Sequence, residues 1–358
     1  MGGQVIEAME RSQFDRLFSG TNAKRAENLA EVLGCDAIPN AYSVPFAPVY
    51  RAMGDDRLKI YMEREMTMVL AQGCALRCKF CAARKITTEF FRDIDVFSND
   101  LEYMVAKAKV FGIDQLEFYT SSLDFFQSSQ VLHQYLEAIA QIQEESGVVI
   151  KIRCLATMTF FLKAHKEIEG LDELLDRAGV WCIGFGVDGA DEEVWEAQKK
   201  RQNKLNEVVE CLDLCKDMGV RAEILMVTGF PEDTPTTLFK NVRNSWRYAA
   251  RWPNTYLRPY LAKQAVPGND EWKIGNGITK ACLENPDLFY NLDFCAMGSR
   301  LTHPRTWHRW TSNAAYLAII LPLAPFGRSC TSPLFPQGIG GILGKLAKLI
   351  NRIMPFDR

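Results

Sequence analysis

Residues 72–81, Gln-Gly-Cys-Ala-Leu-Arg-Cys-Lys-Phe-Cys, decide the interpretation of this chain because they place three thiols within eight residues. The three cysteines are Cys74, Cys78 and Cys81. They follow a short apolar run at residues 67–71, which predicts a strand, so we expect them on a loop at the C-terminal end of that strand. Thiolates are soft ligands that suit iron–sulfur clusters and zinc. The stretch therefore predicts a metal-binding loop.

The number of cysteines narrows the kind of metal site. A structural zinc site usually has four protein ligands, commonly with a second Cys or His pair downstream. No second pair follows the loop closely, and the histidines are all distant in sequence: His133, His165, His303 and His308. Three cysteines hold a four-iron cluster with one iron open to a ligand that is not protein. The sequence favours this open cluster, and a closed zinc site stays as an alternative.

Around the loop, from residue 61 onward, short apolar runs alternate with segments of helical spacing. The runs that predict strands are residues 67–71, 115–120, 148–155, 181–187, 221–227 and 256–260. The segments that predict helices are residues 100–110, 130–145, 172–178, 205–218 and 236–249. Strands without clear alternation, each followed by a helix, indicate a parallel α/β sheet with right-handed crossovers. Six such units form an open doubly wound sheet or a partial (β/α)6 barrel, and in both arrangements ligands gather at the C-terminal ends of the strands.

The chain is expected to have three parts. Residues 1–60 form a short helical extension, with helices predicted at residues 6–18 and 23–33 and an irregular, proline-containing stretch at residues 36–50. Residues 61–265 form the core barrel. Residues 266–358 form a C-terminal region that caps the substrate site or associates with a membrane.

Composition limits the cellular setting. The formal net charge of −2 gives no general reason to expect nucleic acid as a partner. Eleven cysteines, an odd number in a chain that opens without a secretory signal, predict a reducing cytoplasm rather than a disulfide framework. The longest strongly apolar stretch, residues 314–326, contains two prolines and is too short to span a bilayer. We therefore expect a cytoplasmic protein, with a peripheral membrane location left open.

The spacing Cys-x3-Cys-x2-Cys, with Phe80 just before the third cysteine, resembles the hallmark of the radical S-adenosylmethionine (radical SAM) superfamily. The resemblance implies a partial (β/α)6 barrel with a [4Fe–4S] cluster on the three cysteines and S-adenosylmethionine (AdoMet) on the open iron. It also implies reductive cleavage of AdoMet to a 5′-deoxyadenosyl radical, which abstracts hydrogen from an organic substrate. Such a cluster is oxygen-sensitive, and the chemistry needs a reductant such as flavodoxin or ferredoxin.

The resemblance implies AdoMet-binding positions near the first three strands. Phe80 would pack near the adenine. Residues 120–122, which are Thr120, Ser121 and Ser122, stand where the family has a Gly-Gly-Glu-like turn for the amino group, although they lack its glycines and its acid. A serine-rich turn without a ligand is the alternative there. Arg153 suits the AdoMet carboxylate, and a structural ion pair is its alternative.

Further positions follow the later strands. Asp188 is expected to accept hydrogen bonds from the ribose hydroxyls, or else to form an ordinary Asp-Gly turn. Gln202, in a loop with Lys200 and Arg201, stands where related enzymes often place a polar contact to AdoMet. Val227 ends the fifth strand and begins a turn, residues 227–234, that resembles a Gly-Phe-Pro-Gly-Glu-Thr turn of the cobalamin-related branch.

The resemblance covers residues 66–269, but the first sixty residues show no counterpart of that branch's cobalamin-binding domain. Methyl transfer through bound cobalamin is therefore not expected. Four other cysteines are predicted to lie in the core: Cys154, Cys182, Cys211 and Cys215. Three more lack the tight spacing of a second cluster site, which remains an alternative for them: Cys282, Cys295 and Cys330.

The C-terminal region is basic and aromatic. A cluster that suits an anionic or aromatic substrate falls within eleven residues: Arg300, His303, Arg305, Trp307, His308, Arg309 and Trp310. The alternative is a solvated loop with buried tryptophans. Residues 339–354 have the pattern of a basic amphipathic helix, which packs on its own domain or lies on a membrane surface. In the second case a lipid-linked substrate becomes attractive; otherwise we expect a small molecule.

Two other functions compete with radical catalysis. An iron–sulfur electron-transfer or sensor protein predicts four cysteine ligands and no nucleotide pocket. A zinc-stabilised binding module predicts one zinc and no iron after anaerobic purification. No residue identifies the substrate or the outcome of the reaction.

Overall fold

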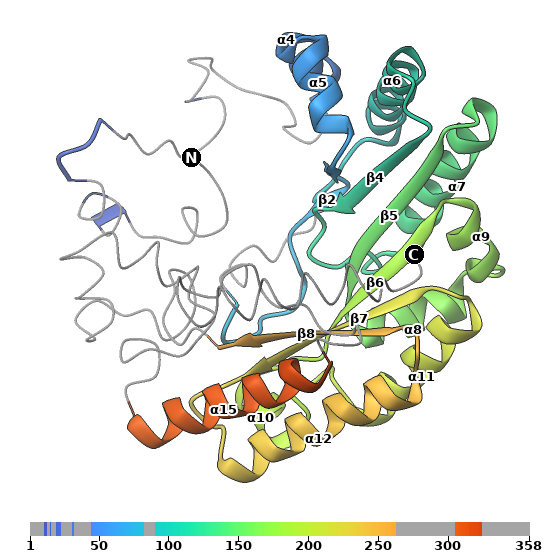
Figure 1. Ribbon diagram of the computed structural model, residues 1–358. Coiled ribbons are helices and arrows are strands. Elements are labelled where there is room, and N and C mark those ends of the chain that lie inside the picture. Colours follow the sequence, from blue (N-terminus) through green and yellow to red (C-terminus); the bar gives the residue numbers. More distant parts are fainter. Residues whose placement is uncertain are drawn as a thin grey trace.

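The computed structural model describes residues 44–81, 90–262 and 305–323, together with residues 11, 12, 15, 19–22 and 31. Its centre is a six-stranded parallel sheet with the order β1-β4-β5-β6-β7-β8 (Figure 1). The strands of this sheet are β1 (Glu65–Met68), β4 (Gln115–Thr120), β5 (Val149–Ala156), β6 (Val180–Gly186), β7 (Arg221–Thr228) and β8 (Thr255–Leu261). The six predicted strands are confirmed as elements of this sheet.

Helices connect the strands and cover one face of the sheet. They are α6 (Ile94–Phe111), α7 (Ser129–Ser146), α8 (Met158–Glu167), α9 (Leu171–Arg177), α10 (Glu192–Ala197), α11 (Leu205–Asp217) and α12 (Pro235–Arg251). Each new strand adds to the same edge of the sheet, so right-handed crossovers leave the connecting helices on the same side. Figure 1 shows them along the convex side of a curved sheet. This order excludes the doubly wound alternative and matches a partial barrel.

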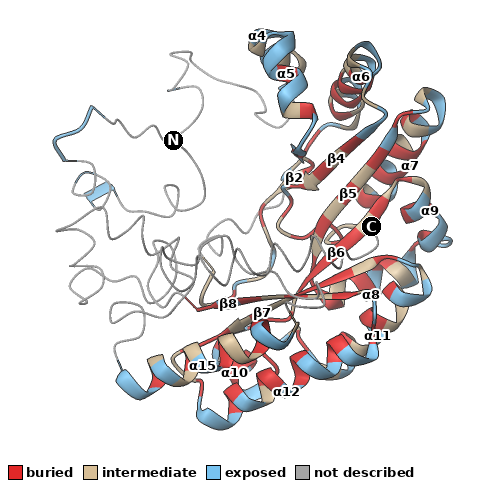
Figure 2. Ribbon diagram, in the orientation of Figure 1, coloured by how far each residue is buried: buried red, intermediate tan, exposed pale blue. Residues whose placement is uncertain are grey.

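The two faces of the sheet differ in burial, as Figure 2 shows. On β5, Ile150, Ile152 and Cys154 are fully buried against the helices, whereas Lys151 and Arg153 on the concave face are only half-buried. Strand side chains alternate between faces, so the concave face, here called the lumen, carries the polar residues. The strands therefore do alternate, unlike the uniformly buried strands that the sequence indicated.

The first strand differs from its prediction. β1 begins at Glu65 and ends at Met68, and the chain then forms β2 (Ala71–Gln72), which pairs antiparallel with β3 (Phe90–Phe91). The apolar run at residues 67–71 thus spans two elements. Glu65 can stand in β1 because its side chain faces the concave side of the sheet, where its carboxylate pairs with Arg153.

Two helices that the sequence did not predict, α8 and α10, occupy short connections. α10 has only six residues, and the Asp191 side chain caps it by accepting hydrogen bonds from the backbone N–H groups of Glu193 and Val194. A helix this short shows little periodicity, so its cap is the stronger signal.

The N-terminal part that the structure describes contains α4 (Ala47–Met53) and α5 (Asp55–Met62). The prediction that residues 36–50 are irregular is wrong for residues 47–50, because Pro48 lies in the first turn of α4, where no backbone N–H is needed. The Asp100 carboxylate of α6 accepts hydrogen bonds from the backbone N–H groups of Phe46 and Ala47, at 2.7 and 2.8 Å. Most of the helices predicted at residues 6–18 and 23–33 lie outside the described residues.

The last described helix, α15 (Thr306–Leu323), packs against α12 and β8. Pro322 has no N–H to donate to the Ala318 carbonyl one turn earlier. The Trp246 indole N–H of α12 donates to that carbonyl at 2.9 Å instead, which joins the two helices. The predicted basic helix at residues 339–354 lies outside the described residues, as do Arg300, His303, Cys282, Cys295 and Cys330.

Among the helices that the structure describes, none is long and apolar enough to cross a membrane.

Candidate functional site

The cysteine loop lies at the C-terminal edge of the sheet, directly after β2. Cys78 is buried, Cys74 and Cys81 are half-buried, and no disulfide joins any cysteine of the described ranges. The Cys81 backbone N–H donates to the Cys78 carbonyl at 3.2 Å, and the Ala75 N–H donates to the Gln127 side-chain oxygen at 3.0 Å. The loop is thus folded on itself and fixed to the segment that follows β4.

The arrangement of the thiols bears on the type of metal centre. Within the residues that the structure describes, no three His, Cys, Asp or Glu side chains are grouped to hold a single metal ion. In an iron–sulfur cluster each thiolate binds a different iron, so the ligands of a cluster need not converge on one point. Burial raises the pKa of the Cys74 thiol to about 11, so that ligation must remove a proton that the buried thiol otherwise keeps at neutral pH.

The remaining described cysteines are confirmed as core residues. Cys154, Cys182, Cys211 and Cys215 are fully buried, and burial raises the pKa of each thiol. They are therefore packed as apolar side chains.

A second segment, residues 198–203 between α10 and α11, braces the cysteine loop. The Lys79 backbone N–H donates to the Gln198 carbonyl at 2.9 Å, and the Gln202 side-chain N–H lies 3.8 Å from the Cys78 sulfur. Glu232 ties both segments together: it accepts from the Gln198 amide at 2.6 Å and forms an ion pair with the Lys79 ammonium at 3.2 Å. We call residues 198–203 the bracing segment.

Phe80 and Val227, both predicted site residues, are brought together. Their side chains pack against a small apolar cluster of Val194, Phe230 and Ala262, and the ring centroids of Phe80 and Phe230 are 5.3 Å apart. The turn after β7 is closed by the Asp233 carboxylate, which accepts from the backbone N–H groups of residues 229 and 230 at 2.7 and 2.9 Å. An apolar wall therefore stands beside the cysteine loop.

Asp188 lies beside this wall and forms a buried ion pair with Lys200 of the bracing segment. Burial by itself would lower the pKa of Lys200, but the Asp188 carboxylate, together with Cys78 and Cys81, raises that pKa overall, which favours the charged ammonium. The Lys200 nitrogen is 5.8 Å from the centroid of the Phe80 ring. A Cβ on Gly186 would lie only 3.2 Å from the Lys200 nitrogen, which explains why a glycine faces the pair.

The backbone at Asp188 also has the shape of the Asp-Gly turn that the sequence offered as an alternative. Asp188 has a φ of 48° and Gly189 a φ of 107°. The Trp195 indole N–H donates to the carbonyls of Val187 and Asp188, at 2.9 and 3.0 Å, and fixes this turn. The two readings of Asp188, as a turn and as a polar site, are therefore compatible, because the turn positions the carboxylate that pairs with Lys200.

Arg153 is placed differently from the AdoMet-binding expectation. Its guanidinium makes two contacts of 2.7 Å with the Glu65 carboxylate and one of 3.5 Å with Glu223, which also accepts from Arg258 at 2.9 Å. The Tyr119 ring lies 4.5 Å below the guanidinium carbon. The structure favours the ion-pair alternative for Arg153, within the lumen.

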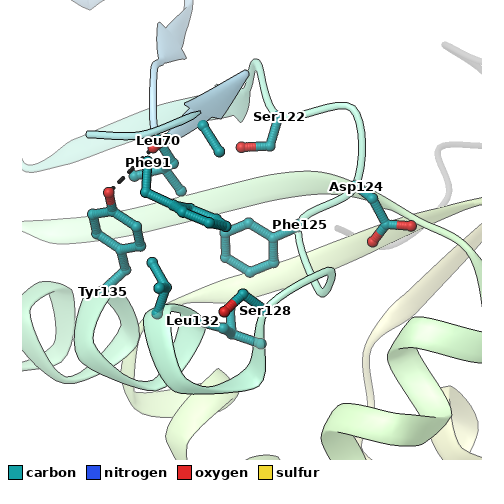
Figure 3. Close-up of a pocket in the computed structure, with 10 residues that line it drawn as sticks. Leu70, Phe91, Ser122, Asp124, Phe125, Ser128, Leu132 and Tyr135 are labelled. Carbon is teal, nitrogen blue, oxygen red and sulfur yellow. Dashed lines mark hydrogen bonds between the residues drawn. The ribbon is translucent and has the colours of Figure 1, made fainter. Parts of the chain in front are cut away.

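Residues 120–122 do not join Phe80. Thr120 is fully buried on the strand face of Leu116 and Phe118, and the Ser121 backbone N–H donates to the Met68 carbonyl at 2.9 Å. Ser122 lines a small pocket together with residues of β3 and α7. Figure 3 shows its hydroxyl at the edge of a pocket of aromatic and aliphatic side chains, and it shows the Tyr135 hydroxyl bonded to the Leu70 carbonyl.

Sequence reasoning missed several polar residues around the site. Asn203 donates to the carbonyls of Gly186 and Val187, at 3.2 and 2.8 Å, and its buried side-chain oxygen has no partner. The buried side-chain nitrogen of Gln127 also lacks a partner, as does the hydroxyl of Thr120, which the sequence did predict as a site residue. Such groups usually mark a site that a ligand or water completes. No spacing signal connects these residues, because they meet only through the fold.

The C-terminal basic and aromatic cluster is partly described. Residues 306–310 are helical, His308 is buried, and Trp307 and Trp310 are 47% and 68% exposed. The alternative of a loop with buried tryptophans is therefore wrong. A ring nitrogen of His308 lies 2.8 Å from the Phe230 carbonyl, which joins α15 to the turn beside Phe80.

Comparisons with known proteins agree with this geometry. Residues 68–240 match the family model described as the Radical SAM superfamily. The fold resembles two structures of the radical S-adenosylmethionine methyltransferase TsrM from Kitasatospora setae. One, with tryptophan substrate and aza-SAM bound, has a TM-score of 0.55 and 15% identity over 80% of this chain and 60% of that chain. The other, with cobalamin and a [4Fe–4S] cluster bound, has a TM-score of 0.51 and 18% identity over 63% of this chain and 38% of that chain.

The chain thus spans less than two thirds of either TsrM structure. At these identities the likeness concerns the fold. No curated protein matches the chain in a sequence search.

Proposed function

Since the chain belongs to the radical SAM superfamily of enzymes, whose cofactors are a [4Fe–4S] cluster and AdoMet, we propose that it cleaves AdoMet reductively to a 5′-deoxyadenosyl radical that abstracts hydrogen from an organic substrate. The observation that carries the proposal is the cysteine loop at the C-terminal edge of a parallel partial barrel, with Phe80 on an apolar wall beside it.

The residues at this edge fit the two cofactors. Three thiols on one braced loop, Cys74, Cys78 and Cys81, supply the soft ligands of the cluster and leave one iron without a protein ligand. Buried polar atoms without partners stand around the loop, on Gln127 and Asn203, and they suit a polar ligand that replaces water.

In this proposal the apolar wall binds the adenine of AdoMet and the Asp188 turn binds its ribose. Phe80, Phe230 and Val227 offer an apolar surface to the adenine. The Asp188 carboxylate accepts hydrogen bonds from ribose hydroxyls, since the turn at residues 188 and 189 positions it beside the wall. For the amino group we retain the backbone carbonyls of residues 120–122, since the Thr120 hydroxyl is fully buried, whereas Arg153 serves the lumen rather than the AdoMet carboxylate.

Substrate and electron donor lie outside the chain. The lumen opens next to the cysteine loop, so we propose that it receives a small-molecule or lipid-linked substrate rather than nucleic acid, in keeping with the net charge of −2. The electron has to come from a one-electron reductant of the flavodoxin or ferredoxin type. A cytoplasmic location, with peripheral membrane contact in the case of a lipid-linked substrate, suits this chemistry.

The test is the formation of 5′-deoxyadenosine, measured by chromatography after anaerobic purification, cluster reconstitution and incubation with AdoMet and dithionite. We expect the wild-type protein to make it and Cys78→Ala to make none. Cys211→Ala is the matched control, because it removes a buried thiol of the core, on α11 and outside the loop. It should lower stability and still give product from the molecules that fold.

The other outcomes identify the competing functions. Iron-loaded protein that makes no 5′-deoxyadenosine, even with candidate substrates present, would favour an electron-transfer or sensor protein. Zinc in place of iron would favour the binding module. If Cys211→Ala and Cys78→Ala are equally well folded and lose product to the same extent, activity does not depend specifically on the cysteine loop.

A further inference from the structure

The side chain of Gln202 contacts the sulfur of Cys78, one of the three cysteines of the loop. The Gln202 side-chain nitrogen lies 3.8 Å from the Cys78 sulfur, within the range of a hydrogen bond to sulfur. A thiolate ligand has no proton and only accepts, so the N–H of the amide, and not its oxygen, faces the sulfur. Gln202 thus directs a donor at a cluster ligand from a position 124 residues away in the sequence.

Both sides of this contact are held firmly by the fold. The Thr159 hydroxyl of α8 lies 2.8 Å from the Gln202 carbonyl, and the Asn203 amide is bonded to the end of β6. On the other side, the Lys79 N–H bonds to the Gln198 carbonyl at 2.9 Å, next to Cys78. These bonds hold the backbones of Gln202 and of the cysteine loop at a fixed separation, so the side-chain N–H of Gln202 is within reach of the Cys78 sulfur.

The neighbouring charge of Lys200 does not replace this donor. The Lys200 ammonium is paired with Asp188 and also interacts electrostatically with Cys78 and Cys81, so it acts on the thiols through its charge. Arg201 forms an exposed ion pair with Glu196. Gln202 adds a hydrogen bond from its side-chain N–H to the Cys78 sulfur.

Hydrogen bonds to cluster sulfurs change the reduction potential, because reduction adds negative charge to the cluster and its ligands, and a donor stabilises that charge. We propose that Gln202 is a positioning residue that raises the reduction potential of the cluster by donating an N–H···S hydrogen bond to Cys78. The inference rests on the proposed function, since it requires the cluster. It assigns to Gln202 an electronic role in place of a direct contact to AdoMet.

The experiment is a redox titration of the reconstituted protein, without AdoMet, followed by electron paramagnetic resonance. We expect Gln202→Leu, which keeps the size and loses the donor, to shift the reduction equilibrium about tenfold toward the oxidised cluster, which is about 59 mV for one electron. Gln202→Glu should shift it further in the same direction, since it adds a negative charge. Arg201→Ala is the matched control from the same loop and should leave the potential at the wild-type value.

Iron content and the AdoMet dissociation constant, measured on the same samples, separate the explanations. A Gln202→Leu protein with full iron and an unchanged potential overturns the inference, and weaker AdoMet binding in that protein would identify Gln202 as an AdoMet contact instead. If Gln202→Leu fails to hold a cluster, Gln202→Glu and Gln202→Asn provide the titration. A wild-type protein that forms no four-iron cluster contradicts the proposed function itself, whereas an active wild type with unshifted variants contradicts only this inference.

Discussion

Two levels of the barrel differ in how their polar side chains are paired. The waist, which comprises Glu65, Arg153, Glu223 and Arg258 in the middle of the lumen, is a chain of ion pairs between β1, β5, β7 and β8. The mouth comprises the cysteine loop, the Asp188 turn, the turn after β7 and the bracing segment. It carries the three thiols of the loop and has buried polar atoms without partners on Gln127 and Asn203.

The difference separates what stabilises the fold from what binds ligands. Glu65 and Glu223 pair with Arg153 across 88 and 70 residues, so the waist links strands that are not neighbours in the sheet. Glu223 is almost fully buried, and breaking a buried pair leaves an uncompensated charge. The mouth also holds a buried ion pair, Asp188–Lys200, beside the cysteines that we propose as cluster ligands. We therefore expect substitutions of the cysteines to change ligand binding, substitutions at the waist to change stability, and substitutions of Asp188 to change both.

The largest effect is expected at the mouth, for Cys81→Ala. The cluster loses one of three protein ligands, so 5′-deoxyadenosine should fall to the level of a reaction without enzyme, while the unfolding free energy of the metal-free protein stays close to wild type. Iron analysis, product chromatography and urea denaturation measure these quantities. Full activity in Cys81→Ala would remove this cysteine from the site and break the comparison.

The next effect is expected at the waist, for Glu223→Ala. It leaves the guanidiniums of Arg153 and Arg258 without the carboxylate between them, so the unfolding free energy should fall by about 3–5 kcal/mol. Urea denaturation measures it. The control is Lys163→Ala, which breaks an exposed pair with Glu167 and should cost about 1 kcal/mol or less.

A stability loss as small as the control's would show that the waist pairs do not hold the lumen together. Should Glu223→Ala fail to fold, Glu223→Gln keeps the shape and part of the hydrogen bonding, and an intermediate loss is expected.

A smaller effect, again at the mouth, is expected for Asp188→Asn. The neutral amide accepts more weakly from ribose hydroxyls, and a hydrogen bond to a charged group contributes about 1.5–3 kcal/mol, so AdoMet should bind about 10- to 100-fold more weakly. Equilibrium dialysis of AdoMet on the cluster-loaded protein measures it. Asp217→Asn, at the exposed end of α11, is the control. If Asp188→Asn and the wild type bind AdoMet with equal affinity, Asp188 does not contact AdoMet and serves only to form the turn.

The smallest effect is expected where α15 packs on α12. Trp246→Phe removes the donor to the Ala318 carbonyl that Pro322 leaves unpaired, and it should lower the unfolding free energy by about 0.5–1.5 kcal/mol without changing AdoMet affinity. Thermal or urea denaturation checks the first part, and dialysis the second. Trp310→Phe, at a 68% exposed position, should stay within about 0.5 kcal/mol of wild type.

Local patterns allowed the sheet to be predicted from the sequence. The apolar runs at residues 115–120 and 221–227 are strands because one face packs on helices, and that face is apolar. The start of β1 was missed because Glu65 faces the lumen, where polar residues are allowed. The order of the strands, which excludes the doubly wound sheet, depends on which edge each strand joins, and no local pattern contains that information.

The site was predictable only where its residues are close in the sequence. The cysteine spacing and Phe80 lie within one loop, so their chemistry could be read directly. Arg153 could not be assigned, since its partners Glu65 and Glu223 are distant and any buried arginine needs a partner of some kind. The contact of Gln202 with Cys78 is likewise set by the fold, through hydrogen bonds from Thr159 and Asn203.

The most direct test of the account is the electron paramagnetic resonance spectrum of the reduced, reconstituted protein with and without AdoMet. Three cysteine ligands leave one iron for AdoMet, so we predict a [4Fe–4S] signal that changes when AdoMet is added and that is absent in Cys78→Ala. A [4Fe–4S] signal that is identical with and without saturating AdoMet would mean that the cluster has no open iron for it, and would contradict the central claim.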